Sequence, residues 1–235
     1  MSPNSIYLIV ASVFGVVIGL DIYNWSKGRK LFSRELKLRH RRKQIDTSVF
    51  VLGFTCLAAS TLFHINIIEY HRPIQHADVA TITLQDFIGF KRPNQTLDGS
   101  NEFAFIVTSI EYEMDDHQVE IKAIFHPSRS YVFNERLVDK FLLEHELYHF
   151  HITELHARLI RSQLAALNQM PTVNQVERIV NTQRTSEYIM QKEYDNDTYH
   201  SYVLKKQKAW QGKIDSLLSS HQKFAQTAVR FPLTP

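Results

Sequence analysis

The chain has 235 residues, 44% of them hydrophobic, with a formal net charge of +3 and one cysteine, Cys56. Its length suits one ordinary domain with additional elements, and a single cysteine excludes a disulfide bond within the chain. The positive charge is concentrated, because nine basic residues and one acid lie between Lys27 and Lys43. The rest of the chain is mildly acidic, which argues against nucleic-acid binding by the protein as a whole.

Two apolar stretches flank the basic segment. Residues 5–25 carry no charge before Asp21, and residues 47–68 carry none. A helix needs ~20 apolar residues to cross the hydrocarbon core of a bilayer, so both stretches predict transmembrane helices. Gly15 and Gly19 form a G-x-x-x-G motif that would let the first helix pack closely on a partner helix. The alternative is a buried hydrophobic hairpin of a soluble protein.

The basic segment also predicts an orientation. Lys and Arg concentrate in short cytoplasmic loops, so both termini are expected on the other side of the membrane. The sequence thus predicts a membrane anchor over residues 1–70 and an exported domain over residues 71–235. The predicted localisation is the cytoplasmic (inner) membrane, multi-pass, with the C-terminal domain periplasmic or extracytoplasmic. The lipid bilayer is then a partner, and the basic loop suits its anionic headgroups.

About three β-strands are predicted after residue 70. Asp78–Leu84 reads DVATITL, Phe103–Tyr112 is rich in β-branched and aromatic residues, and Gln118–His126 alternates apolar with polar residues. These patterns predict a small antiparallel sheet, with a hairpin connection at Met114–His117. The strand Gln118–His126 is a candidate for binding an extended peptide by edge pairing, and an ordinary sheet strand is the alternative.

Helical periodicity replaces this alternation beyond Pro127. The first predicted helix has Asn134 as its N-cap and extends to about Met170, where Pro171 stops it. Thr172 and Gln175 predict a capping box that opens a second helix. A last helix carries apolar residues at spacings near whole turns: Val203, Trp210, Ile214 and Leu217. Strands first and helices after predict an α+β fold class for this part.

The first predicted helix contains HELYH, which matches the H-E-x-x-H motif. Residues four apart lie on one face of a helix, so His145 and His149 project side by side at a separation that one metal ion can bridge. Neutral imidazoles suit Zn²⁺, which lowers the pKa of bound water to ~7. Glu146 would then act as general base. The motif predicts a catalytic zinc site.

A third zinc ligand must come from outside this motif. His156 lies too far along a continuous helix to bind the same ion, so we expect it at most to contact a ligand or the substrate. The best stretch is Glu193–Ser201 (EYDNDTYHS), where Asp195, Asp197 or His200 could complete the site. The alternative for this stretch is a polar turn between two helices.

Three separated blocks of the sequence resemble a family of poorly characterised bacterial proteins described as zinc-dependent proteases. The resemblance covers roughly residues 80–218 and rests on ITLQDFIGFKRP, on HELYHFHITELHARLIR, and on EYDNDTYHS with Gln207 and Trp210. It implies a zincin-like domain with a small antiparallel sheet and about three helices. It also implies that His145 and His149 bind zinc and that Glu146 is the base.

The last block of that family has the form Y-D-x-x-T-x-H, which Tyr194, Asp195, Thr198 and His200 match. The resemblance implies that His200 is the third ligand, with Asp195 orienting it or taking its place. The chain departs from the family pattern at His151, where the pattern has Asp. If that carboxylate matters for metal binding or folding, its replacement affects activity.

These features together predict a membrane-anchored zinc-dependent peptidase that hydrolyses peptide bonds on the outer face of the cytoplasmic membrane. Its partner is a peptide or protein substrate and not a nucleic acid. Tyr194 and His156 are candidates to stabilise the oxyanion. The alternative is a non-catalytic, membrane-tethered module that binds a metal or a partner. Four protein ligands closing the site would indicate structural zinc.

Overall fold

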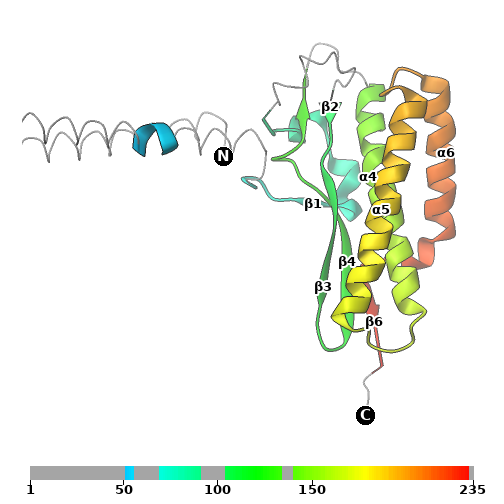
Figure 1. The fold of residues 1–235 in the computed structure, drawn as a ribbon. Helices are drawn as coiled ribbons and strands as arrows, with labels where there is room; N and C mark the ends of the chain where they lie inside the picture. The colour runs from blue at the N-terminus through cyan, green and yellow to red at the C-terminus, as the bar shows by residue number, and fades with distance from the viewer. Residues whose placement is uncertain (1–50, 56–68, 91–103, 134–139, 233–235) are drawn as a thin grey trace, which may run out of the picture. The chain divides into compact units, whose positions relative to one another are not determined.

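The elements of the fold lie in the unit His71–Pro235, one of the two units into which the chain divides, the other being Met1–Tyr70. The structure, a computed structural model, describes residues 51–55, 69–90, 104–133 and 140–232 (Figure 1). The strands are β1 (Ile74–Gln75), β2 (Ala104–Phe105), β3 (Thr108–Met114), β4 (Gln118–Phe125), β5 (Tyr131–Val132) and β6 (Ala228–Arg230). The helices are η2 (His76–Thr81), η3 (Leu84–Asp86), α4 (Lys140–Ala165), α5 (Val173–Thr198), α6 (Leu204–Ser220) and η5 (Gln222–Phe224).

The membrane part of the predicted fold class is wrong. Within the described ranges no helix combines the length and the apolar composition that crossing a membrane requires. The long helices are charged: α4 alone carries Glu154, Arg158 and Arg161 within two turns. The structure is a mixed α and β fold with small antiparallel sheets. The same finding contradicts the predicted multi-pass localisation in the inner membrane with a periplasmic domain.

Much of the predicted anchor lies outside the described residues. This applies to the stretch 5–25 with Gly15 and Gly19, and to the basic segment after it. Of the stretch 47–68 the structure describes residues 51–55, which form one helical turn. Asn134, the predicted N-cap of the first helix, is likewise outside the described ranges.

Strand β4 is the inner strand of a four-stranded antiparallel sheet. It pairs with the whole length of β3, from Thr108 opposite Phe125 to Met114 opposite Val119. Its other edge pairs with β1 near the end of the strand and with β6 near the start. The expected edge pairing of a peptide with Gln118–His126 is therefore wrong. The stretch Asp78–Leu84 forms no strand and instead contains 3₁₀ turns.

The predicted alternation of β4 places its apolar side chains in the core, since Val119, Ile121, Ala123 and Phe125 are buried. Helix α4 covers this face of the sheet, and α5 and α6 lie beside it (Figure 1). One side of α4 packs against the sheet through Phe150 and other apolar residues. The other side packs against Trp210 and Ile214 of α6 through Ile152 and Leu155. A helix between two layers is apolar on two sides.

A buried ion network fixes α4 against the sheet. The guanidinium of Arg161 is 1% exposed and donates hydrogen bonds to the carbonyl oxygen of Ile121 in β4, at 3.0 and 2.8 Å. It also pairs with Glu154, which accepts from Arg158 one turn further along. A buried charge is tolerated only when paired and hydrogen-bonded, so this network permits one rotation of α4 about its axis. The same rotation sets the direction of the histidines earlier in the helix.

Helix α5 begins as the sequence predicts. The hydroxyl of Thr172 accepts from the backbone N–H of Gln175, and the side chain of Gln175 accepts from the N–H of Thr172. This capping box is confirmed. At its other end α5 stops in a run of three left-handed residues, Tyr199, His200 and Ser201. Such a run is uncommon outside glycine and turns the chain sharply toward α6.

Candidate metal centre

His145 and His149 project from the same side of α4, as their spacing predicts. Their Nε2 atoms lie 3.2 Å apart and both side chains are buried. Helix α5 runs antiparallel beside them, because His145 contacts Asp195 whereas His149, one turn later, contacts Gln191, one turn earlier. This antiparallel packing brings the last turns of α5 to the start of α4.

Asp195 completes a triangle of ligand atoms. Its Oδ1 lies 3.2 Å from His145 Nε2 and 2.9 Å from His149 Nε2. A zinc ion with four tetrahedral ligands at 2.0–2.2 Å separates neighbouring ligand atoms by roughly 3.3 Å. The three edges, 3.2, 2.9 and 3.2 Å, therefore fit one zinc ion with little movement of the side chains.

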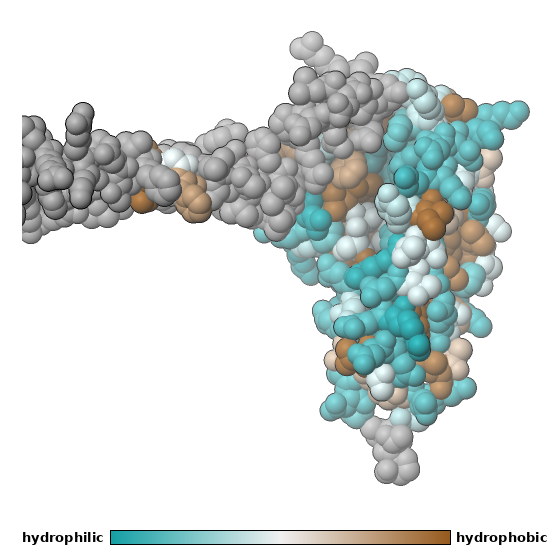
Figure 2. All heavy atoms as spheres, viewed as in Figure 1, coloured by the Kyte–Doolittle hydropathy of each residue, from teal (hydrophilic) through white to brown (hydrophobic). Residues whose placement is uncertain are grey.

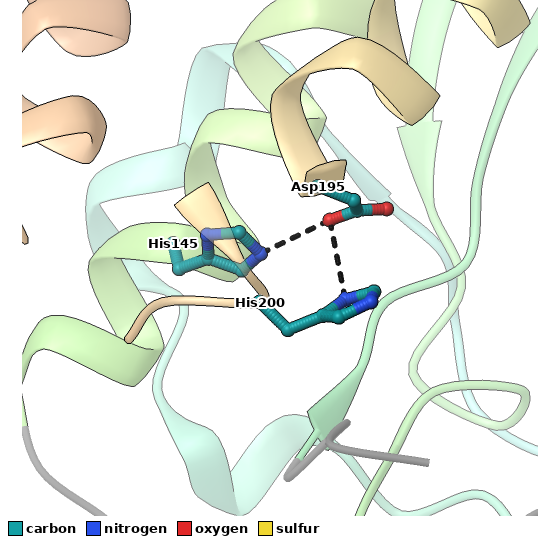
Figure 3. Close-up of side chains that lie close together, drawn as sticks. All are labelled: His145, Asp195 and His200. Carbon is teal, nitrogen blue, oxygen red and sulfur yellow. Dashed lines mark hydrogen bonds and ion pairs between the residues drawn. The ribbon is translucent and has the colours of Figure 1, made fainter. Parts of the chain in front are cut away.

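His200 approaches the same carboxylate from the turn after α5 (Figure 3). Its Nδ1 lies 3.6 Å from Asp195 Oδ1, and potential ligand atoms of His145, Asp195 and His200 all lie within 4.8 Å of one another. The left-handed run at Tyr199–Ser201 gives His200 this position, because the helical path of α5 has ended by then. The shorter contacts of Asp195 favour it over His200 as the third ligand of the two histidines.

Two side chains of α5 hold the histidine rings in place. Gln191 Oε1 accepts a hydrogen bond from Nδ1 of His149, and its Nε2 donates to the carbonyl oxygen of His149 at 3.0 Å. With Nδ1 as donor, His149 presents the lone pair of Nε2 to the centre of the triangle. The ring of Tyr194 stacks on His145, with centroids 4.6 Å apart.

The electrostatics of the triangle favour a cation. Burial alone would raise the pKa of Asp195, but the two imidazoles hold that pKa well below its usual value. Burial lowers the pKa of His149, yet the charges of Asp195 and Glu146 outweigh it and raise the pKa to about 9. Burial lowers the pKa of His145 to about 4 in spite of Asp195. One proton on His149 thus occupies the place that a metal cation would take.

Glu146 lies beside the triangle, on the wall of a cavity of about 450 Å³. Its Oε2 accepts a hydrogen bond of 3.0 Å from the backbone N–H of Ile106, in the segment between β2 and β3. The side chain is buried, and the cavity that it lines also receives the three triangle residues and His200. A carboxylate in this position can take a proton from water held at the triangle.

The other predicted site residues lie elsewhere. Asp197 accepts a hydrogen bond from the indole of Trp210 at 2.9 Å, and Nδ1 of His156 contacts Gln183 at 2.9 Å. The hydroxyl of Tyr194 donates to the carbonyl oxygen of His145, at 3.5 Å, and is buried. Tyr194 and His156 do not line the cavity, so neither is placed to stabilise an oxyanion there.

Two parts of the site were missed by the sequence reasoning. Gln191 stands four residues before Asp195, one helical turn away, so it shares a helix face with Asp195 and could have been found. No sequence pattern marks the backbone N–H of Ile106 as part of the site, because any residue except proline supplies the same donor.

No family model matches the chain, and comparisons with curated proteins and with solved structures give no significant match. The resemblance to zinc-dependent proteases therefore stays a prediction.

Proposed function

We propose that this protein is a zinc-dependent peptidase. The proposal rests on one observation above all: the ligand atoms of His145, His149 and Asp195 form a triangle with edges of 2.9–3.2 Å beside Glu146 in an accessible cavity. Three protein ligands with room for water are typical of catalytic zinc sites.

The chain would supply positioning and proton transfer. Zinc, when bound, supplies a Lewis acid and lowers the pKa of bound water to ~7. The N–H of Ile106 donates to Oε2 of Glu146 and would orient the carboxylate. Glu146 would take the proton of the attacking water and deliver it to the leaving amine. Gln191 would keep the imidazole of His149 oriented, Tyr194 would do the same for His145, and Asp195 would be the third ligand.

A peptide substrate is supported by the backbone that lines the cavity. Val107 directs its N–H and C=O toward Ser130 and His126, whereas Ile106 N–H turns the other way, toward Glu146. Because backbone direction alternates along an extended chain, Thr108 also presents its N–H and C=O on the side of Glu146. The N–H and C=O of Thr108 would form a short strand edge that an extended peptide can pair with.

A non-catalytic metal-binding module is the second candidate. The observation that favours it is the position of His200, whose imidazole lies within reach of the ligand atoms of His145 and Asp195. If His200 joined the three ligands of the triangle, four protein ligands would close the site and leave no place for water.

The test is zinc content and peptide cleavage by the full chain, in wild type and three variants. We expect about one zinc in wild type, its loss in His149→Ala, and its retention in Glu146→Gln with cleavage reduced by roughly 10²–10⁴-fold. His151→Ala is the matched control, because it removes an imidazole of the same helix outside the triangle and should keep the zinc. Bound zinc without cleavage of any peptide in a random library would contradict the peptidase and favour the closed site.

A further inference from the structure

The cavity is longer than the metal centre requires. It extends from Asp195 and His200 along the side of α5 to Arg184, three turns earlier in that helix. Its opposite wall is the segment Ala104–Thr108. At 1.5 Å per residue, the eleven residues from Arg184 to Asp195 span roughly 16 Å.

The β side of the cavity gives an independent length. Arg184 Nη2 donates to the carbonyl oxygen of Ile110 in β3 at 2.6 Å. Ile110 is four residues from Ile106, whose N–H holds Glu146, and four residues of strand span roughly 13 Å. An extended peptide rises about 3.3 Å per residue. Both lengths therefore place the guanidinium of Arg184 four or five peptide residues away from the reacting carbonyl.

Outside the metal centre, the described lining of this cavity carries more cationic than anionic side chains. Its cationic side chains come from different elements: Arg184 and Lys192 from α5, and Arg129 from the turn after β4. Beyond Glu146 and Asp195, the described lining includes one further carboxylate, Glu187. Oε1 of Glu187 accepts a hydrogen bond from Thr153 at 2.6 Å, and burial raises its pKa. The carboxylate of Glu187 is thus engaged by Thr153, and the charge of Arg184 lowers the same pKa that burial raises.

Arg184 is suited to bind a carboxylate. A guanidinium has five N–H donors in a fixed planar fork, and the bond to Ile110 uses one of them. That bond also fixes where the guanidinium lies, so less conformational entropy is lost when a ligand binds. The helical side of the unit on which α5 lies is mostly hydrophilic (Figure 2).

We propose that the cavity selects peptides with an acidic residue four or five positions from the scissile bond, and that Arg184 binds the carboxylate of this residue. This inference rests on the proposed peptidase function, because it takes the metal centre as the place of the scissile bond. Lys192, one turn from Asp195, lies nearer the metal centre and adds positive charge along the path.

The test separates binding from cleavage. In the zinc-loaded full chain carrying Glu146→Gln, fluorescence anisotropy would measure the affinity for labelled neutral peptides with a single Glu, Gln or Lys at successive positions. We expect Glu to bind about five- to tenfold more tightly than Gln at one position. The position should be four or five residues from the bond that wild type cuts.

Variants of the same background identify the residue responsible. Arg184→Gln should remove the preference for Glu, and Arg184→Glu should change it to a preference for Lys. Arg178→Gln is the matched control, since Arg178 is an exposed arginine of α5 that does not line the cavity, and it should keep the preference.

Equal affinity for Glu and Gln peptides at every position, or a preference that survives Arg184→Gln, would overturn the inference. If wild type cuts peptides without an acidic preference, the peptidase function stands and this inference fails. If no peptide is cut, the peptidase function fails, and a Glu preference that Arg184→Gln abolishes still supports Arg184 as a carboxylate site.

Discussion

Helix α4 contributes to two histidine pairs, one buried and one half-buried, that differ in what surrounds them. The pocket pair, His145 and His149, has Nε2 atoms 3.2 Å apart with a carboxylate oxygen of Asp195 against both. The far pair consists of His151 on α4 and His76 in η2, whose Nε2 lies 2.8 Å from His151 Nδ1. Both pairs join two imidazoles at hydrogen-bond distance, so imidazole alone does not make a cation site.

The far pair shows what burial does without a contacting carboxylate. Burial lowers the pKa of His76 to about 4 and also lowers the pKa of His151, with the charge of Arg158 acting in the same direction on both. Asp215 is the carboxylate whose charge most raises the pKa of His151, and it accepts hydrogen bonds from the hydroxyl of Tyr148. The far pair thus stays neutral, whereas the pocket pair holds a proton where a metal ion fits.

The largest effect should come from removing the carboxylate that distinguishes the two pairs. Asp195→Ala takes one ligand and the negative charge from the triangle, so zinc affinity should fall by at least roughly 100-fold. His200→Ala should keep about one zinc per chain, because the three shorter contacts remain. Competition with a chromophoric chelator measures both affinities. The reverse result, with zinc lost in His200→Ala and kept in Asp195→Ala, would make His200 the third ligand.

The pocket pair could be predicted from sequence because its geometry is local. The turn of an α-helix alone brings residues 145 and 149 together, and the capping box at Thr172 is equally local. The choice between Asp195 and His200 could not be made, because it depends on where α5 leaves helical geometry at Tyr199.

Contacts between distant segments were beyond the sequence. His76 is 75 residues from its partner His151, and nothing in the pattern HADVAT indicates a short helix that packs there. The membrane prediction relied on hydropathy alone, and the described part of the chain contains no helix suited to crossing a membrane. The predicted helices and the strands at Phe103–Tyr112 and Gln118–His126 are largely present, because they rest on periodicity that packing against a sheet reinforces, whereas the predicted strand Asp78–Leu84 is not.

A smaller effect should follow from loosening the pocket pair without touching its ligands. Gln191→Ala removes the acceptor that orients His149, and such supporting contacts typically contribute roughly 10- to 100-fold in metal affinity. Gln183→Ala is the matched control, since Gln183 makes the same kind of contact with His156, outside the triangle. Zinc titration of both variants should show weaker binding in Gln191→Ala alone. Equal affinities would mean that Gln191 only packs against the ring.

The smallest effect concerns the far pair and depends on pH. The pKa of His76 is about 4 in the folded protein and about 6.5 in the unfolded chain, so the unfolded chain binds more protons as the pH falls. The stability that neutral His76 contributes is complete above pH 6.5 and is lost as the pH falls toward 4. Between pH 7.5 and 5.5 this loss amounts to about 1 kcal/mol.

His76→Gln isolates this effect, because it removes one titrating group and leaves the others in place. Those facing it are Glu154, which raises its pKa, and His151, Arg158 and Arg161, which lower it. Urea unfolding of the zinc-free full chain at both pH values should show a smaller acid-induced loss in the variant than in wild type. Identical losses would place the proton uptake elsewhere, and the contrast between a neutral far pair and a protonated pocket pair would then fail.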